Sequence, residues 1–341
     1  MTALTVLRAG PAVTVQDMGR PGYLDRGLSR GGAADRLALA EGAALLGQSA
    51  DLAALELAGL SGVFQAEGDL RIALTGAPMA ADINGQRIAW AASHQLRAGD
   101  RLTIGAALSG SYGYLHLGGG IDTPMVLGAR ATHLAAGLGR VLTAGDRLPA
   151  GPDHGGRTGL RLPVTDRFTD RFSGGTVRIV AGFQTPLFSA ATCARFEATA
   201  FARGARANRM GLALEGGASF TAEGQRTILS EVISPGDIQM TGDGQPFVLL
   251  PECQTTGGYP RIGTVIPCDL PRVVQCPPGG QLRFTFTDRT AATEAEARHA
   301  AHLQGLGRQL QPLIRDPHDI ADLLGYQLIG GVISAFEEDS A

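Results

Sequence analysis

The stretch Leu70-Arg71-Ile72-Ala73-Leu74, followed at once by Thr75-Gly76-Ala77-Pro78, shows the pattern that decides the fold. Large apolar residues at every second position indicate a β-strand, and the Gly and Pro that follow indicate a turn. Similar short runs lie at 101–104, 112–117, 177–180, 247–250 and 281–286. Asp82-Ile83-Asn84-Gly85 and Gly242-Asp243-Gly244-Gln245 offer the positive φ that tight hairpins need. Short strands between Gly-rich turns predict a mainly β fold of the barrel or sandwich type.

A few helices interrupt the strands. Residues 33–46 are rich in Ala and Leu and end at Gly47, which favours a helix that stops there. Thr293 and Glu296 match a capping box, so a second helix is predicted from about residue 293 to about residue 310. The stretch 317–333 predicts one short helix followed by an apolar tail.

The length of 341 residues fits two domains of roughly 150 residues each. The stretch 152–175 contains the pairs Gly155-Gly156 and Gly174-Gly175, which favours a linker. We therefore predict an N-terminal β-barrel domain over 1–151 and a C-terminal β-barrel domain over 176–290. A helical extension is expected over 291–341.

The composition excludes several kinds of chemistry. All 29 members of the Lys+Arg count are Arg, so this chain has no Schiff-base lysine, Walker A lysine or biotinyl-lysine. A net charge of −3 does not indicate a basic surface that would bind nucleic acid or an anionic membrane. The sequence has no apolar run of about 20 residues and no signal-peptide pattern at its start. Four cysteines without Cys-x-x-Cys spacing favour reduced thiols in a cytoplasmic protein.

Motifs for metal binding or a serine nucleophile are missing. There is no Gly-x-Ser-x-Gly elbow and no His-Glu-x-x-His helix. His299 and His302 could share a helix face but lack a third ligand nearby, so we expect no metal. His116 and His133 are interpreted as locally hydrogen-bonded residues rather than catalytic bases.

Three polar, Gly-rich segments are candidates for a site. The first, 14–23, brings together Gln16, Asp17 and Arg20; alternatively, Asp17 pairs with Arg20 to brace a loop. The second contains Asn208 and Arg209, whose guanidinium could hold a carboxylate, although an internal Arg–Asp brace fits equally.

The third segment is Gln254-Thr255-Thr256-Gly257-Gly258-Tyr259-Pro260. Its hydroxyls and glycines could present several donors to a small anion or a developing oxyanion; the alternative is a tight turn whose Thr hydroxyls satisfy the backbone. The predicted catalytic residues are Asp17, Arg20, Arg209, Thr255, Thr256 and Tyr259. The predicted substrate-binding residues are Gln16, Asn208, Gln254, Gly257 and Gly258. We expect these loops to converge on one cavity.

At these residues the chain resembles the carboxyltransferase-domain family that includes the third subunit of bacterial ATP-dependent 5-oxoprolinase. The family also includes allophanate hydrolase subunit 2, the antagonist of the Kip kinase inhibitor and the carboxyltransferase part of urea amidolyase. The resemblance covers about residues 4–288. It rests on these stretches in family order: 14–17, 19–22, 53–56, 75–77, 118–122, 209–211, 242–246 and 254–260.

The resemblance implies two cyclophilin-like β-barrel halves with a ligand cleft between them, and work inside a complex. In the oxoprolinase setting the partners are subunits A and B, a lactam-utilisation protein and a Kip-inhibitor-like protein. Together they couple ATP hydrolysis to opening of 5-oxo-L-proline into L-glutamate. ATP is then expected to be held by the complex, outside any P-loop of this chain. In the urea amidolyase setting, a carboxyl group would pass to urea or a related amide from carboxybiotin, with the biotin carried on a partner chain.

The sequence departs from the family pattern at several positions, including Gly31-Gly32-Ala33-Ala34-Asp35, Glu41-Gly42, 128–132, 137–140 and Glu252-Cys253. These changes bear on the substrate more than on the fold. The main hypothesis is a hydrolase subunit of ATP-dependent 5-oxoprolinase that is active only within a complex. The alternatives are a biotin-dependent carboxyltransferase and a regulatory antagonist of a kinase-inhibitor protein.

Overall fold

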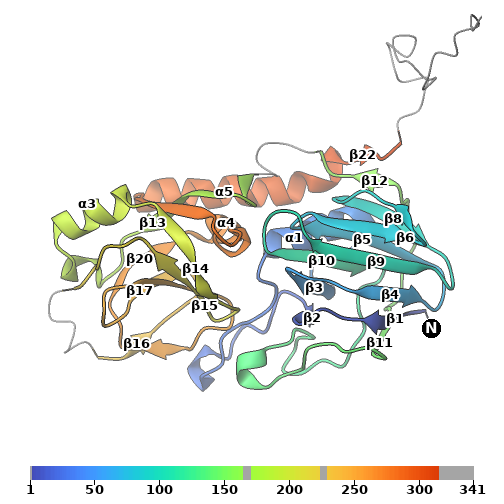
Figure 1. Ribbon diagram of the computed structural model, residues 1–341, viewed down its shortest axis with the longest axis horizontal. Helices are drawn as coiled ribbons and strands as arrows, with labels where there is room; N and C mark the ends of the chain where they lie inside the picture. The colour runs from blue at the N-terminus through green and yellow to red at the C-terminus, as the bar shows by residue number, and fades with distance from the viewer. Residues whose placement is uncertain (1, 164–169, 223–228, 315–341) are drawn as a thin grey trace, which may run out of the picture.

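The computed structural model describes residues 2–163, 170–222 and 229–314. Within these ranges the chain forms two β-rich halves, joined along one side by the long helix α5 (Arg289–Gly305) (Figure 1). The prediction of a mainly β fold with few helices is confirmed.

The N-terminal half consists of two sheets that share one hydrophobic core. The six-stranded sheet has the order β11 (Arg147–Pro149), β1 (Ala3–Arg8), β4 (Val63–Ala66), β9 (Arg101–Ala107), β6 (Met79–Ile83) and β7 (Gln86–Arg87). The seven-stranded sheet has the order β2 (Val13–Gln16), β3 (Ala54–Ala58), β10 (Tyr112–Leu117), β5 (Leu70–Gly76), β8 (Ala92–Leu96), β12 (Leu160–Arg161) and β22 (Gln311–Pro312). Leu4, Phe64 and Leu102 of the first sheet share a core with Leu55 and Ile72 of the second.

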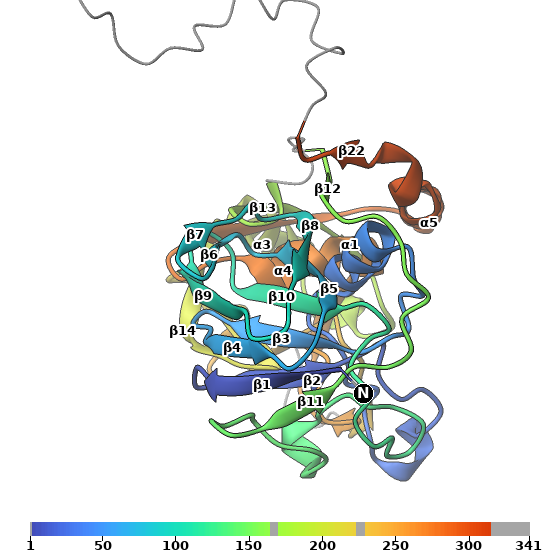
Figure 2. The same ribbon diagram turned by 90° about the vertical axis from the view of Figure 1, so that its right-hand side faces the viewer.

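The alternation seen at residues 70–74 has a clear structural role. Ile72 and Leu74 belong to the core between the sheets, whereas Ala73 belongs to a second apolar cluster with Leu45 and Leu46 of helix α1 (Arg36–Leu46). Helix α1 packs against β5 and β10 (Figure 2). Because both faces of β5 are covered, every residue of the strand is buried.

The C-terminal half is a closed seven-stranded barrel. Its strands follow the order β13 (Gly174–Val180), β20 (Arg261–Val265), β17 (Asp237–Met240), β18 (Pro246–Leu249), β15 (Gly211–Glu215), β14 (Phe201–Ala207) and β21 (Gln281–Phe286). Phe196 of helix α3 (Ala190–Ala198) packs with Phe201, Phe220 and Phe284 in the core of this half. Strands β16 (Glu231–Val232) and β19 (Thr256–Gly257) form a separate small sheet.

Several short helices complete the fold. They are the helix α4 (Leu270–Gln275) and the 3-10 helices η1 (Leu24–Arg26), η2 (Leu134–Ala136), η3 (Thr185–Leu187), η5 (Pro267–Asp269) and η6 (Leu306–Gln309). Gln275, at the end of α4, binds the N-terminal half: its side-chain oxygen accepts from the backbone nitrogens of Ser111 (2.9 Å) and Tyr112 (3.0 Å). Its side-chain nitrogen donates to Asp35 at 2.9 Å. The two halves are therefore joined by fully buried polar contacts, because Gln275 is 0% exposed.

The predicted local signals are confirmed in most places. All six strands named from the sequence are present, and the Asn84-Gly85 turn has φ values of 53° and 84° at its two residues. Helix α1 ends at Gly47, which has φ 65° as expected of a C-terminal glycine. It begins at Arg36 rather than at residue 33, because the Asp35 side chain accepts from the backbone nitrogen of Ala38.

The predicted start of the C-terminal helix is wrong. Helix α5 begins at Arg289, and its N-cap is Asp288, whose carboxylate accepts from the backbone nitrogen of Ala291 at 2.8 Å. Thr293 lies inside the helix, where its hydroxyl donates to the carbonyl oxygen of Arg289. Glu296 accepts from the backbone nitrogen of Cys268 instead of closing a capping box.

The domain linker over 152–175 and the helical extension over 291–341 stay predictions. The linker range 152–175 includes β12, and Arg171 near its end forms a buried ion pair with Glu41 of α1, with distances of 2.7 and 2.6 Å. After α5 the chain returns to the N-terminal half, where β22 pairs with β12. The helix expected over 317–333 lies outside the described residues.

Gly42 in α1 provides a test of how closely the helix packs on the sheet. A Cβ atom at this position would lie 2.2 Å from Nε2 of the buried His116. Ala is a better helix former than Gly, yet we expect Gly42→Ala to lower the free energy of unfolding by about 1–3 kcal/mol because of overpacking. Urea denaturation would measure the change. An increase in stability would contradict this packing.

We expect the buried His116 to make the stability of the protein depend on pH. Its Nε2 lies 2.8 Å from the Thr75 hydroxyl, which itself donates to the carbonyl oxygen of Ala38, so the neutral ring donates from Nε2. Burial lowers the pKa of His116 from 6.5 to about 3. The unfolded chain therefore takes up this proton first, and stability falls as the pH drops from about 6.5 towards 3. His116→Gln should show a shallower loss in urea titrations at matched pH values; an unchanged slope would contradict the assignment.

Candidate functional site

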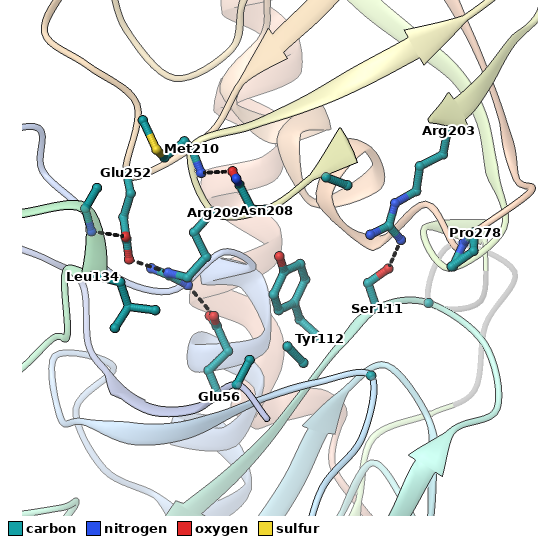
Figure 3. Close-up of a pocket in the computed structure, with 16 residues that line it drawn as sticks. Glu56, Ser111, Tyr112, Leu134, Arg203, Asn208, Arg209, Met210, Glu252 and Pro278 are labelled. Atoms are coloured by element: carbon teal, nitrogen blue, oxygen red, sulfur yellow. Dashed lines mark hydrogen bonds and ion pairs between the residues drawn. The ribbon is translucent and has the colours of Figure 1, made fainter. Parts of the chain in front are cut away.

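A cavity of about 500 Å³ lies between the two halves. The N-terminal half contributes Glu56, Ser111 and Tyr112, and the C-terminal half contributes Arg203 and Arg209 (Figure 3). The other lining residues are Ala12, Ala58, Gly59, Gly110, Leu134, Ala135, Ala207, Asn208, Met210, Glu252 and Pro278. The wall is largely apolar with a few charged groups, as in many sites for small polar molecules.

Arg209 is held at one side of this cavity by contacts with both halves. It lies in the turn between β14 and β15, and its Nη1 donates to Glu56 of β3. Its Nε donates to Glu252 at 2.5 Å, and its Nη2 donates to the carbonyl oxygen of Gly32 at 2.5 Å. The Arg209 side chain is 10% exposed, and its single positive charge is shared by two buried carboxylates.

The remaining oxygens of the two carboxylates are also satisfied. The second oxygen of Glu56 accepts from the Tyr114 hydroxyl (2.7 Å) and from the backbone nitrogen of Ala34 (2.8 Å). Burial, together with the nearby Glu56 charge, raises the pKa of Tyr114, so its hydroxyl stays protonated and donates. The second oxygen of Glu252 accepts from the backbone nitrogen of Ala135 at 3.1 Å. These partners fix both carboxylates against Arg209.

Asn208 shapes the turn that presents Arg209. Its side-chain oxygen accepts from the backbone nitrogens of Met210 (2.8 Å) and Gly211 (3.2 Å). The Asn208 backbone nitrogen donates to the Gly211 carbonyl oxygen at 3.0 Å. This local bonding explains why Asn precedes Arg at the tip of the hairpin.

The other side of the cavity carries a second guanidinium. Arg203 lies on β14, and its Nη1 donates to the Ser111 hydroxyl (2.6 Å) and to the carbonyl oxygen of Cys276 (2.7 Å). Tyr112 is drawn between Arg203 and Arg209 (Figure 3). Burial raises the pKa of Tyr112 to about 12, which keeps its hydroxyl protonated at neutral pH.

Of the predicted site residues, all of which lie in the described ranges, Asn208 and Arg209 line this cavity. Asp17 lines a different hollow of about 340 Å³, and its carboxylate accepts from the backbone nitrogens of Gly19 (2.8 Å) and Arg130 (2.6 Å). Arg20 is buried and donates to the carbonyl oxygen of Ala131 at 2.5 Å. These contacts hold residues 130–131 against residues 17–20.

Gln16 has a similar structural environment. Its side-chain nitrogen donates to the Thr14 hydroxyl (3.0 Å) and to the carbonyl oxygen of Thr132 (3.1 Å). The Gln16 side chain is therefore used within the fold, on the same segment that Asp17 and Arg20 hold.

The Thr-Thr-Gly-Gly-Tyr loop also lies apart from the cavity lining. Thr255 is buried, and its carbonyl oxygen accepts from the backbone nitrogen of Ile233 at 3.0 Å. Thr256 and Gly257 form β19, and Gln254, Gly258 and Tyr259 are exposed. The expected convergence of Asp17, Arg209 and Thr255 on one cavity is not seen, and the roles assigned to these residues stay predictions.

Sequence reasoning missed the residues that surround Arg209 and Arg203. Glu56 could have been found, because a Glu within the apolar strand Ala54–Ala58 requires a buried partner. Glu252 follows the apolar strand β18 in a comparable way. Ser111, Tyr112 and Arg203 show no local signal, because tertiary contacts alone bring them together.

Neither a metal-binding cluster nor a membrane-spanning helix is found in the described part of the chain. Residues 2–163, 170–222 and 229–314 contain no group of three or more His, Cys, Asp or Glu side chains placed to hold a metal ion. In the same ranges, every helix is too short or too polar to cross a membrane.

Replacing Arg209 should destabilise the protein rather than only impair a ligand contact. Arg209→Met leaves Glu56 and Glu252 buried without a counter-charge, and loss of one partner from a buried ion pair costs about 3–5 kcal/mol. We expect a loss of this size in the free energy of unfolding measured by urea denaturation. Arg206→Met, at an exposed position of β14 three residues before Arg209, is the matched control and should stay within about 0.5 kcal/mol. A loss below about 1 kcal/mol for Arg209→Met would contradict the structural role.

Combining Arg209→Met with Glu56→Gln and Glu252→Gln removes the uncompensated charges together with the guanidinium. This triple variant should regain part of the lost stability, because neutral amides are less costly to bury than unpaired carboxylates. The same denaturation experiment measures the recovery. No recovery would indicate that lost packing, rather than charge, dominates.

Comparison with known proteins agrees with this architecture. Residues 26–286 match the family model "Carboxyltransferase domain, subdomain A and B". The chain is 33% identical over 311 residues to the 5-oxoprolinase C subunit of Escherichia coli, an alignment that covers 90% of this chain and 98% of that protein. The solved structure of TTHA0988 superposes with a TM-score of 0.75 at 30% identity, covering 84% of this chain and 55% of that one. The K. lactis urea amidolyase gives a TM-score of 0.79 at 22% identity, covering 92% of this chain and 21% of that one. The chain belongs to the carboxyltransferase domain family with subdomains A and B.

Proposed function

We propose that this chain is a subunit of an ATP-dependent 5-oxoprolinase complex that opens 5-oxo-L-proline to L-glutamate. One observation carries the proposal: the chain aligns with 98% of the length of the Escherichia coli 5-oxoprolinase C subunit at 33% identity. The alignment with the Saccharomyces cerevisiae urea amidolyase, by contrast, covers 8% of that protein. The correspondence is therefore to the whole of one relative and to a small part of the other.

The reaction needs both ATP-dependent activation and ring opening, and these two steps can be divided between subunits of a complex. A lactam carbonyl is a poor electrophile, so ring opening at neutral pH calls for activation of its oxygen, which ATP can supply by phosphorylation. Water then adds to the activated carbon to form a new C–O bond, the C–N bond breaks, and the released amine takes up a proton. A second water hydrolyses the resulting acyl phosphate, which releases inorganic phosphate and leaves the glutamate carboxylate. We assign ATP binding to the complex and propose subunits A and B, a lactam-utilisation protein and a Kip-inhibitor-like protein, as the partners.

The cavity between the halves is the proposed place for the small molecule. Its volume of about 500 Å³ exceeds what a five-membered lactam with one carboxylate needs, which leaves space for a group from a partner. Tyr112 offers a hydroxyl donor, and Arg203 offers a guanidinium. Such fixed donors could stabilise negative charge as it develops on the lactam oxygen.

Reconstitution tests the proposal directly. The chain mixed with subunits A and B should release glutamate and ADP from 5-oxo-L-proline and ATP, whereas the chain alone should be inactive. Glutamate release is measured by a coupled assay, with controls that omit ATP or each subunit in turn. Absence of turnover from the complete, folded complex would refute the proposal.

The family model favours one alternative activity, because its name describes a carboxyltransferase. In that case a biotin-bearing partner would be required, and labelled carboxyl would pass from carboxybiotin to urea or another amide. A purely regulatory antagonist of a kinase inhibitor would show neither reaction but would bind the inhibitor protein. The same purified chain can be used in all three assays.

A further inference from the structure

Arg203 is a cation in the cavity wall without an ionic partner. Within the part of the chain that the structure describes, no Asp or Glu oxygen lies within ion-pair distance of its guanidinium, in contrast to Arg209. The charges of Glu56 and Glu252 offset that of Arg209, so the Arg203 side of the cavity is its positive side. Arg203 is half-buried, and an anion that binds beside it would compensate its positive charge.

The guanidinium of Arg203 is held in place from one edge only. Its Nη1 donates to the Ser111 hydroxyl at 2.6 Å and to the carbonyl oxygen of Cys276 at 2.7 Å. Among the described residues, its Nε and Nη2 have no hydrogen-bond partner. These two nitrogens form the edge that can donate two parallel hydrogen bonds to a carboxylate.

The group that orients Arg203 is itself fixed by the junction between the halves. The backbone nitrogen of Ser111 donates to the buried Gln275 side chain at 2.9 Å, and the Ser111 hydroxyl also lies 3.2 Å from the carbonyl oxygen of Cys276. The backbone nitrogen of Arg203 donates to the Gly280 carbonyl oxygen at 2.9 Å. Both ends of the Arg203 side chain are thus anchored, which reduces the entropy lost on binding.

Tyr112 adds a neutral donor to the same cavity. It is 8% exposed and lines the cavity between the two arginines (Figure 3). Its hydroxyl has no hydrogen-bond partner among the described residues, so it is available to a ligand.

We propose that the Arg203 side of the cavity binds the carboxylate of a small-molecule ligand, with Tyr112 donating to a neighbouring polar atom of the same molecule. The inference rests on the proposed function, because a lactam that bears one carboxylate matches this arrangement of one cation and one neutral donor. It also assigns to Arg203 the role that the sequence suggested for Arg209, whose donors are used by Glu56, Glu252 and Gly32.

The kinetic test uses Arg203→Gln in the reconstituted complex. Loss of a two-point contact to a carboxylate should raise the KM for 5-oxo-L-proline by about 10- to 100-fold, with a much smaller change in kcat. Arg206→Gln is the matched control, because Arg206 lies on the same strand, is exposed and binds Gln245 outside the cavity. Its KM should equal that of the wild type. Arg203→Lys keeps the charge but loses the two-donor edge, and should lie between wild type and Arg203→Gln.

A binding test separates this inference from the proposed function. Saturation-transfer NMR on the full wild-type chain and on the complex compares 5-oxo-L-proline with uncharged 2-pyrrolidinone, which lacks the carboxylate. We expect Arg203→Gln to weaken binding of the carboxylate compound by about 10- to 100-fold and to leave 2-pyrrolidinone unaffected. Thermal unfolding of each variant confirms that the comparison is made on folded protein.

Each outcome has a defined meaning. Turnover with an unchanged KM in Arg203→Gln would overturn the carboxylate site and leave the 5-oxoprolinase proposal standing. Absence of turnover, together with carboxylate binding that requires Arg203, would support the site and refute the proposed function. Failure of the wild-type chain and complex to bind the carboxylate compound would overturn the inference.

Discussion

One buried guanidinium fixes the two halves of this protein relative to each other. Arg209 comes from the barrel, and it binds Glu56 of the N-terminal sheet, Glu252 of its own half and the Gly32 carbonyl oxygen. Neither carboxylate could remain buried without that charge, since an unpaired ion in a dry interior is very costly. The position of the cavity follows from this cluster, because its members form one wall.

Much of the fold was predictable because its signals are local. Asn84-Gly85 can adopt positive φ without strain, and Gly47 ends α1 in the left-handed conformation expected of a C-terminal glycine. The start of α1 was placed three residues too early, because the Asp35 cap was not identified. The start of α5 was mispredicted for a related reason. Two potential caps lie within six residues, and Asp288, two residues after the end of β21, caps the helix instead of Thr293.

The site was less predictable because its residues come from distant parts of the chain. Asn208 and Arg209 were identified from their own segment, whereas Ser111, Tyr112 and Arg203 meet only after both halves have folded and packed together. Asp17 and Arg20 look similar to Arg209 in sequence, as polar residues among glycines. Their side chains instead bind backbone atoms of residues 130 and 131 and support a loop. Composition cannot distinguish these two uses of a polar side chain.

The pairing of β22 with β12 has a consequence for biosynthesis. Arg161 and its partner Gln311 are 150 positions apart, and the entire barrel is encoded between them. A ribosome must therefore finish the second half before the edge of the first sheet can be closed. Until then the edge of β12 that pairs with β22 is uncovered on the nascent chain. Strand β22 is translated after the whole barrel, and its pairing with β12 adds the last strand to the seven-stranded sheet of the N-terminal half.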